Sequence, residues 1–245
     1  AGGETAGIVT ALGDGVEGID VGTAVAVLGG GLRDINVASA NSVFPYPTES
    51  LSAGQAAAVP VNYGTAWFAL HDRARVQPGE TVLITGAAGG IGAALAEQML
   101  ERGASLALIG RSEDELSSLT EQLRATGGTV HAAGADLLDP AARIQATARL
   151  QDQLGGVDLL INCAGLLSFR PFAEEDPAVI ERIVQLNLVT PMMLARQLLP
   201  GMLERGSGRI INIGSTFGSI GFAWFAAYSA SKFGLRGFSE SLRRE

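Results

Sequence analysis

From Thr81 onward, short apolar runs alternate along the chain with longer amphipathic stretches. The apolar runs have the length of buried strands, and the stretches between them have helical periodicity. Strands are expected at 81–85, 105–109, 129–133, 157–161 and 208–214. This alternation predicts an α/β fold in which helices cover a parallel sheet.

Three of the expected helices carry start signals. Ser112 is followed three residues later by Glu115, which together form a capping box. Asp139 and Asp176 each precede a proline, and an acidic cap followed by proline suits the first turn of a helix. Helices are therefore expected to begin directly after Ser112, Asp139 and Asp176.

The first eighty residues have a different pattern. Short β-branched runs at 8–10, 24–28 and 35–37 are separated by turns rich in glycine and aspartate, which is typical of an all-β segment. A helix-like stretch at about 53–74 follows. A domain boundary is expected between about residues 50 and 80, and we place it so that segment 1–78 precedes a domain at 79–245.

Residues 85–92 read TGAAGGIG and lie between a strand-like run and the helix-like run 93–100. Glycines let the chain turn sharply and bring backbone N–H groups close to a pyrophosphate, whose charge lies at the positive end of the helix. An ordinary tight turn between strand and helix has the same glycines. The loop therefore indicates a dinucleotide site only in combination with other residues.

Composition and charge exclude several classes of partner and site. The chain has 245 residues, 47% of them hydrophobic and 17% charged, which is typical of a globular protein. Its net charge of -8 repels the phosphates of nucleic acids and anionic membrane surfaces, so neither is an expected partner. Cys163 is the single cysteine, so no intrachain disulfide can form, and with only His71 and His131 beside it no metal site is expected.

The longest apolar stretch, 183–203, contains several polar residues and a proline. This composition favours a buried or interface helix over a membrane span. The chain opens without the basic and apolar regions of a signal peptide. We expect a soluble cytoplasmic protein.

Tyr228 and Lys232, in the sequence YSASK, are four residues apart on a stretch with helical periodicity, so their side chains share one face of a helix. A nearby cation favours the phenolate and lowers the tyrosine pKa from about 10. Such a pair is also common on solvated helices. Ser215, however, follows the last expected strand, and ligands of parallel α/β folds bind at the carboxyl edge of the sheet. The three residues together favour acid–base chemistry at that edge.

The chemistry-bearing residues follow one another in a familiar order. They are TGxxxGIG at 85–92, Asp136 after the third strand, Asn162-Cys163-Ala164-Gly165 after the fourth, Asn187 in the long helix, and then Ser215, Tyr228 and Lys232. Residues 79–245 thus resemble the short-chain dehydrogenase/reductase family. The resemblance implies a Rossmann-type doubly wound parallel sheet with strand order 3-2-1-4-5, and it stops before the last strands of that family.

The resemblance also assigns catalytic roles. Tyr228 would be the general acid/base that exchanges a proton with the substrate oxygen. Lys232 would hold the nicotinamide ribose and depress the tyrosine pKa. Ser215 would hydrogen-bond the same substrate oxygen, and Asn187 would shape a proton relay through water to Lys232.

The resemblance also indicates which residues would bind the cofactor. Arg111 stands after Gly110 at the end of the second strand, where a carboxylate would select NAD, so NADP(H) is preferred over NAD(H). A solvated turn arginine would give the same sequence. Cys163 replaces a second Asn of the family and is expected to be a buried inert thiol. The remaining cofactor residues are Gly86, Gly90, Ile91 and Gly92 for the pyrophosphate, Asp136 and Leu137 for the adenine, and Asn162, Ala164 and Gly165 beside the adenosine ribose.

These residues imply an NADP(H)-dependent oxidoreductase that interconverts a secondary alcohol and a ketone. Aromatic residues between Ser215 and Tyr228 favour a small hydrophobic substrate. They are Phe217, Phe222, Trp224 and Phe225. The helices that contain Asn187 and Tyr228 are expected to form contacts in a homo-oligomer.

Residues 1–92 resemble a second family, the medium-chain, zinc-independent quinone oxidoreductases. Residues 2–29 are similar to the middle of their GroES-like β domain, and 51–84 to the helix and connector that lead to their nucleotide-binding domain. The loop 85–92 fits both families and is the expected junction, whether by natural fusion or by a recombined reading frame.

The resemblance to quinone oxidoreductases lacks the opening strands of that family's β domain, and the resemblance to short-chain dehydrogenases stops before that family's last strands. We therefore expect intact site residues but weak turnover. Two alternatives stay open at this point. One is a medium-chain quinone or enone reductase, and the other is a non-catalytic dinucleotide-binding module.

Overall fold

The computed structural model describes residues 4–29, 34–69 and 74–245. The chain divides into two compact units, Ala1–Phe68 and Ala69–Glu245. The expected boundary after residue 78 differs from this division, because the connector at 74–78 belongs to the second unit. Residues 70–73, which include His71, lie outside the described residues.

The first unit is a small antiparallel sheet with one helix. Strands β1 (Glu4–Ile8), β2 (Ala24–Leu28) and β3 (Val43–Pro45) pair in that order, and helix α1 (Ala53–Phe68) packs on β1 and β2. Residues 24–27 of the central strand are buried. The expected β-branched run at 35–37 is not a strand, and its Val37 is 94% exposed. Propensity is overridden here because β2 pairs with 43–45 instead.

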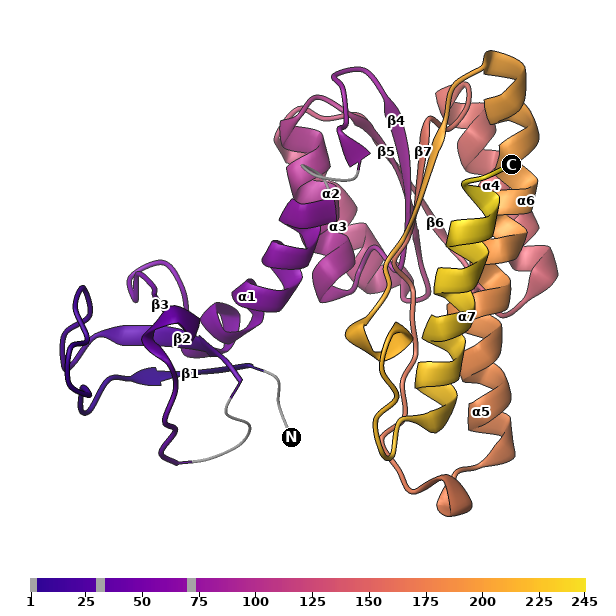
Figure 1. The fold of residues 1–245 in the computed structure, drawn as a ribbon. Coiled ribbons are helices and arrows are strands. Elements are labelled where there is room, and N and C mark those ends of the chain that lie inside the picture. Colours follow the sequence, from indigo (N-terminus) through magenta and orange to yellow (C-terminus); the bar gives the residue numbers. More distant parts are fainter. Residues whose placement is uncertain (1–3, 30–33, 70–73) are drawn as a thin grey trace. The chain divides into compact units, whose positions relative to one another are not determined.

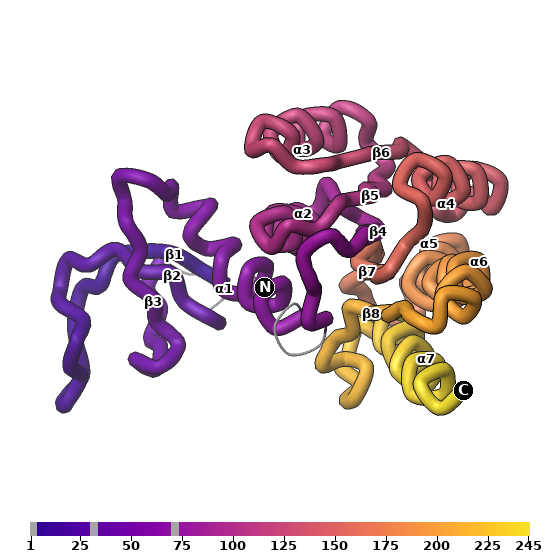
Figure 2. The backbone as a smooth tube through the Cα atoms, turned by 90° about the horizontal axis from the view of Figure 1, so that it is seen from above, coloured from indigo at the N-terminus to yellow at the C-terminus, as the bar shows by residue number. Residues whose placement is uncertain are grey.

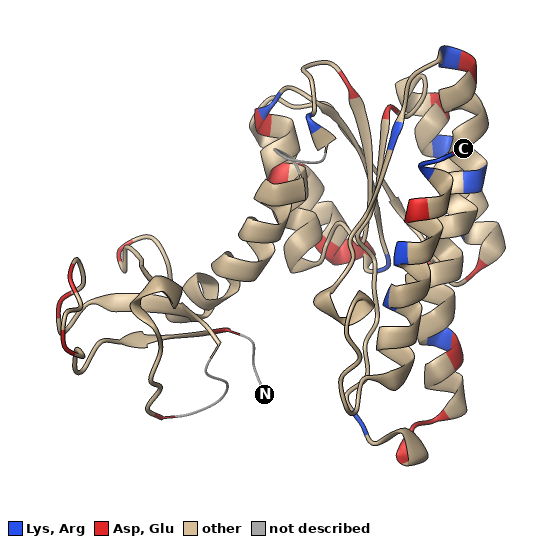
Figure 3. Cartoon of the chain, in the orientation of Figure 1, with Lys and Arg blue, Asp and Glu red and all other residues tan. Residues whose placement is uncertain are grey.

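Charge is distributed unevenly between the units. Every charged side chain in the described part of the first unit is acidic, whereas Lys and Arg are found in the second unit (Figure 3). The first unit therefore contributes a negative surface to the chain.

The second unit contains a five-stranded parallel sheet (Figure 1). Its strands are β4 (Thr81–Thr85), β5 (Ser105–Gly110), β6 (Val130–Gly134), β7 (Leu159–Asn162) and β8 (Arg209–Asn212), and their order is β6-β5-β4-β7-β8. This confirms the predicted order 3-2-1-4-5. Because all five strands are parallel, their carboxyl ends meet at one edge, which is where the predicted site residues follow them.

Helices cover both faces of this sheet. Helices α2 (Gly90–Glu101) and α3 (Glu113–Ala125) lie on one face; α4 (Pro140–Leu154), α6 (Thr190–Arg205) and α7 (Ala226–Leu242) lie on the other (Figure 2). All three predicted caps are confirmed, because the side chains of Ser112, Asp139 and Asp176 accept backbone N–H groups at the starts of α3, α4 and α5 (Pro177–Val184).

The centre of the sheet forms the core of this unit. Strands β4, β5 and β7 are almost wholly buried, as their apolar sequences require for a sheet covered on both faces. Strand β8 lies at the edge of the sheet, and each of its residues is partly exposed. Leu194, Leu198 and Met202 of α6 pack into the same core.

A single helical segment runs from Pro177 to Arg205 through α5, a π-helical turn η4 (Gln185–Val189) and α6. Among the described residues it is the one helix long and apolar enough to cross a membrane, by length and composition alone. Its α6 part is packed against the sheet, as the polar residues within it led us to expect.

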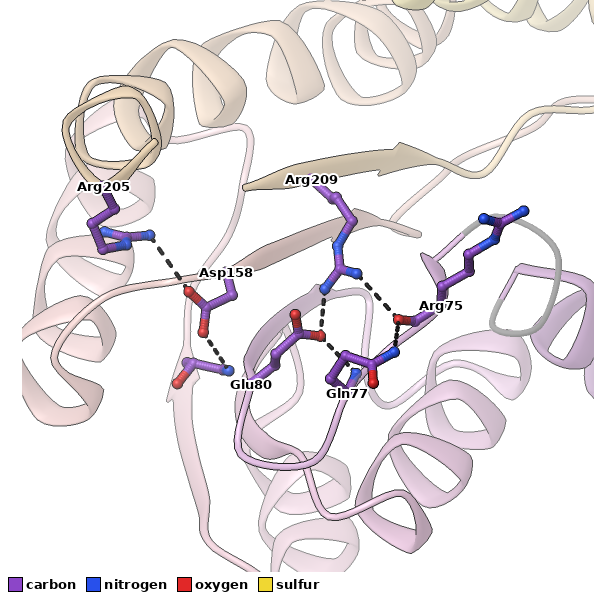
Figure 4. A network of polar contacts seen from close by, with 7 residues as sticks. Arg75, Gln77, Glu80, Asp158, Arg205 and Arg209 are labelled. Atoms are coloured by element: carbon purple, nitrogen blue, oxygen red, sulfur yellow. Dashed lines mark hydrogen bonds and ion pairs between the residues drawn. The ribbon is translucent and has the colours of Figure 1, made fainter. Parts of the chain in front are cut away.

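Polar contacts tie the segment before β4 to the edge strand (Figure 4). The Arg209 guanidinium pairs with Glu80 and donates to the Arg75 carbonyl at 3.2 Å. Glu80 also accepts the Gln77 N–H at 2.8 Å. The connector is thereby attached to β8 at the amino edge of the sheet.

A second set of contacts joins β4 to β7 and α6. The Asp158 carboxylate accepts the Thr81 N–H at 2.9 Å and lies 3.8 Å from the Arg205 guanidinium (Figure 4). Arg205 also donates to the Val157 carbonyl at 2.6 Å. These contacts leave the opposite, carboxyl edge of the sheet for ligands.

Candidate active site

The glycine loop joins β4 to α2 in tight backbone contact with its surroundings. Gly86 has a φ of +67°, and a Cβ there would lie 2.8 Å from the Ala164 Cα. A Cβ on Gly92 would lie 2.2 Å from the Gly86 carbonyl oxygen. These two glycines are therefore required by contacts of the chain with itself, as well as by any ligand.

Helix α2 begins at Gly90, whereas the sequence placed its start at residue 93. Gly90, Ile91 and Gly92 thus form its first turn. The N-cap is Gly89, which has no side chain to accept the first N–H groups of the helix. An anion can take that place, because the N-terminus of a helix carries partial positive charge. The loop fits a dinucleotide pyrophosphate.

The turn after β7 is held against this loop by Thr85. The Thr85 hydroxyl oxygen accepts the N–H groups of Cys163 at 3.1 Å and Ala164 at 3.3 Å. Thr85 is buried, and sequence reasoning missed it. The contact places Ala164 and Gly165 beside the glycine loop, where the sequence predicted an adenosine ribose.

Asn162 begins a chain of hydrogen bonds that crosses to α7. Its amide Nδ2 donates to Asn212 Oδ1, Asn212 Nδ2 donates to Ser239 Oγ, and Ser239 donates to the Leu235 carbonyl, all within 2.7–2.8 Å. Asn162 is 3% exposed, and its Oδ1 has no hydrogen-bond partner in the described part of the chain. These hydrogen bonds link the ends of β7 and β8 to the helix that carries Tyr228 and Lys232.

Arg111 and Asp136 lie at the rim of the sheet. Arg111 is exposed, and in the described part of the chain no side chain pairs with it. Asp136 is exposed, and its Oδ1 accepts the Leu138 N–H at 3.0 Å, while Leu137 is buried. Both polar groups are accessible to a ligand at the carboxyl ends of β5 and β6.

Tyr228 and Lys232 lie on one face of α7, as predicted. The Lys232 Nζ lies 5.7 Å from the centroid of the Tyr228 ring and donates to the Ile213 carbonyl at 2.8 Å. Lys232 is buried, and this burial lowers its pKa, an effect that the nearby Cys163 thiol partly opposes. An ammonium has three N–H groups, so those not bonded to Ile213 can face a ligand.

Asn187 lies in the π-helical turn and is almost wholly buried, at 1% exposed. Its Oδ1 accepts the Leu166 N–H, and its Nδ2 donates to the Leu166 carbonyl, both at 2.8 Å. The same Nδ2 donates at 3.1 Å to Ser231, whose hydroxyl donates to the Tyr228 carbonyl at 2.7 Å. Asn187 thus connects the turn after β7 with the first turn of α7. Single-turn π segments in α-helices are frequently found at functional sites.

Ser215 stands after β8, and its hydroxyl oxygen accepts the Phe217 N–H at 3.2 Å. The Phe217 ring meets the Tyr228 ring edge to face, with centroids 5.9 Å apart. Phe222 stacks on Phe217 at 4.3 Å. The loop from Ser215 to Tyr228 therefore brings the predicted aromatic residues together at the tyrosine.

Phe169, which sequence reasoning missed, extends this group from the turn after β7. Its ring lies 4.9 Å from both Trp224 and Phe225. The Arg170 N–H donates to the Trp224 carbonyl at 3.0 Å, so backbone and rings join the two loops. Trp224 has a φ of +71°, in the left-handed region that large side chains seldom adopt.

Cys163 is half-buried beside Lys232. Burial raises the pKa of its thiol to about 11, and the nearby lysine partly opposes this rise. A thiol of this kind is protonated and unreactive at neutral pH. This agrees with the inert role expected from the sequence.

The comparisons with known proteins decide the family. The short chain dehydrogenase family matches residues 80–245. The chain belongs to that family. A ketoacyl reductase, HetN, of Nostoc sp. is 38% identical over 167 residues, which are 68% of this chain and 58% of that protein. The fatty acyl-CoA reductase Rv0547c of Mycobacterium tuberculosis is 38% identical over 184 residues, which are 72% of this chain and 62% of that protein.

Solved structures of short-chain dehydrogenases agree with the fold. A metagenomic short-chain oxidoreductase in complex with NADP is 34% identical, with a TM-score of 0.65 over 68% of this chain and 78% of the other. NAD+-bound xylitol dehydrogenase is 26% identical, with a TM-score of 0.65 over 67% of this chain and 64% of the other. The two structures hold different nicotinamide cofactors.

This short-chain dehydrogenase chain spans less than two thirds of the length of either curated relative. The family match begins at residue 80, so the likeness of residues 1–92 to quinone oxidoreductases stays a prediction.

Proposed function

We propose that this chain carries the cofactor-binding and proton-transferring part of an NADP(H)-dependent reductase that interconverts a ketone and a secondary alcohol. The observation that carries the proposal is the buried Lys232 ammonium, held by the Ile213 carbonyl beside the Tyr228 ring at the carboxyl edge of the sheet. Family membership and the reductases among the relatives support it.

The nicotinamide, when bound, supplies the hydride. The protein's own task is placement and proton transfer. Tyr228 gives its phenolic proton to the carbonyl oxygen of a ketone and takes it back from an alcohol. The Lys232 cation lies beside the Tyr228 ring, where negative charge develops as the proton leaves, and the Ser215 hydroxyl donates a hydrogen bond to the same substrate oxygen. Asn187 holds the turn at Leu166 and, through Ser231, the backbone of Tyr228.

The proposed cofactor is NADP(H) in preference to NAD(H). Gly110 and Arg111 end the second strand without a carboxylate, and the Arg111 guanidinium is exposed and unpaired in the described structure. A guanidinium suits the 2′-phosphate of NADP, whereas a carboxylate would bind the ribose hydroxyl of NAD.

The proposed substrate is a hydrophobic ketone. Phe169, Phe217, Phe222, Trp224 and Phe225 adjoin one another and lead to Tyr228. Three of these rings are about half exposed, so they present apolar surface beside the proton donor.

The test is turnover of a panel of hydrophobic ketones with NADPH and with NADH. We expect a higher kcat/KM with NADPH, and loss of turnover in Tyr228→Phe with unchanged NADPH binding. Tyr46→Phe, in the first unit, is the matched control and should leave both unchanged. NADPH binding without turnover in either the wild type or Tyr228→Phe would favour a non-catalytic module instead.

Further expectations from the sequence belong to the same proposal. We propose a homo-oligomer formed through the helices that contain Asn187 and Tyr228, and a cytoplasmic protein whose partner is a small molecule. Apolar residues are exposed on these helices, among them Met192, Met193 and Phe233. Chromatography of the purified chain with light scattering would measure the oligomer.

A further inference from the structure

A buried arginine lies behind the proposed adenine site. Arg143, on α4, is 5% exposed, and no carboxylate pairs with it in the described part of the chain. Its Nη1 donates to the Leu137 carbonyl at 3.1 Å. A buried cation rarely adds stability over an apolar side chain of similar size, so stability alone does not explain this arginine.

A second buried side chain donates to the same carbonyl. Thr190, which is 2% exposed and follows the π-helical turn at the start of α6, donates its hydroxyl to the Leu137 carbonyl at 3.3 Å. One backbone oxygen thus accepts two hydrogen bonds, one from α4 and one from the start of α6. A carbonyl has two lone pairs, so this arrangement fixes the orientation of the peptide group.

That peptide group is also the one that holds Asp136. Its N–H, which belongs to Leu138, donates to Asp136 Oδ1 at 3.0 Å. Hydrogen bonds that share a peptide group strengthen one another, and a bond from a charged donor is the stronger kind. The positive charge of Arg143 therefore polarises this one peptide group and strengthens the hydrogen bond from the Leu138 N–H to the Asp136 carboxylate.

We infer that Arg143 and Thr190 are positioning residues that hold the Asp136 carboxylate for the 6-amino group of the cofactor's adenine ring. This rests on the proposed function, since it names the group that Asp136 recognises. A carboxylate is an acceptor only, and the amino group is the hydrogen-bond donor of the adenine ring. With Oδ1 occupied by Leu138, the other oxygen is free for that donor. Through Thr190, the same peptide is joined to the helix that carries Asn187.

The test compares two reduced cofactors whose purine rings differ around position 6. NADPH carries adenine, whereas reduced nicotinamide hypoxanthine dinucleotide phosphate carries an oxygen in place of the amino group and a hydrogen on ring N1. Dissociation constants of the full chain for both are measured by calorimetry. We expect the wild type to bind NADPH about tenfold more tightly, the factor of one hydrogen bond to a charged group.

Variants on the hydrogen-bond path should lower this ratio. Asp136→Ala should bring it close to one, and Arg143→Met and Thr190→Val should each reduce it about threefold or more. Arg143→Lys, which keeps a buried donor, should restore part of it. The ratio of two constants measured on one sample does not depend on the fraction of folded protein.

Two changes on the same helix are matched controls. Thr147→Val removes a buried hydroxyl that has no partner in the described structure, and Arg149→Met removes an arginine that donates to the Ala132 carbonyl. Both should keep the wild-type ratio. Equal weakening of both cofactors in Arg143→Met and Thr190→Val would overturn the inference and leave these residues a structural role. A wild-type chain that binds neither cofactor would overturn the proposed function as well.

Discussion

Replacement of Gly92 by alanine tests the close packing of the glycine loop. A Cβ at this position would lie 2.2 Å from the Gly86 oxygen and 2.9 Å from both the Gly86 carbonyl carbon and the Ala87 Cα. All three atoms belong to the backbone, so no side chain can move aside. The start of α2 would have to shift away from the loop by a large part of an ångström.

The expected cost combines two opposing effects. Overpacking of a tight site costs about 1–3 kcal/mol, and more where backbone must move. Alanine regains about 1 kcal/mol over glycine inside a helix. We expect Gly92→Ala to lower the free energy of unfolding of the second unit by about 1–2 kcal/mol, and to weaken NADPH binding because the first turn of α2 moves.

Gly237 is the matched control, because it also lies inside a helix and, apart from its chain neighbours and its own helix backbone, no described atom lies within 4 Å of an added Cβ. Gly237→Ala should raise stability by about 0.5–1 kcal/mol. Urea unfolding is followed in a Trp67→Phe background, where fluorescence comes from Trp224 of the second unit. If Gly92→Ala were stabilised like Gly237→Ala, the close approach of loop and helix would be refuted.

Three further outcomes are expected. Asn187→Ala should cost about 2–3 kcal/mol, because it leaves both polar groups of the Leu166 backbone without their partner; urea unfolding measures this, and a cost below 0.5 kcal/mol would contradict it. Trp224→Gly should be more stable than Trp224→Ala by about 1 kcal/mol, because both lose the ring but only alanine keeps the strain of a positive φ; the reverse order would refute that strain. Cys163 has a pKa of about 11 in the folded chain against 9.0 as the ordinary value, so its contribution to stability should be lost as the pH rises from about 9 to 11, and Cys163→Ala should remove this loss. Its alkylation at pH 8 should be at least about tenfold slower in the folded than in the unfolded chain, and equal rates would show an accessible thiolate.

The parallel sheet could be predicted from the sequence because each strand is an apolar run bounded by turn and cap signals. Ser112, Asp139 and Asp176 act over three residues or fewer, so local sequence determines these helix starts. The run at 35–37 has the composition of a strand, but among the described residues no strand pairs with it, and pairing is a property of distant residues.

The site was predictable where spacing brings residues together, as for Tyr228 and Lys232 on one helix. Contacts between distant segments could not be foreseen. Thr85 meets the turn after β7, Phe169 meets Trp224, and Arg143 turns back to Leu137. Each of these depends on the packed fold, and Arg143 in an amphipathic helix has the sequence appearance of a solvated side chain.

The hydrogen-bond chain that begins at Asn162 has a fixed direction. The Leu235 carbonyl can only accept, so Ser239 must donate to it and accept from Asn212, whose oxygen then accepts from Asn162. A backbone oxygen on α7 thus determines which way an amide on β7 is turned. Aspartate has the same shape as asparagine but lacks the N–H groups. Replacement of either Asn162 or Asn212 by aspartate would therefore remove a donor and interrupt the series of hydrogen bonds. At these two positions the fold distinguishes an amide from an acid of equal size.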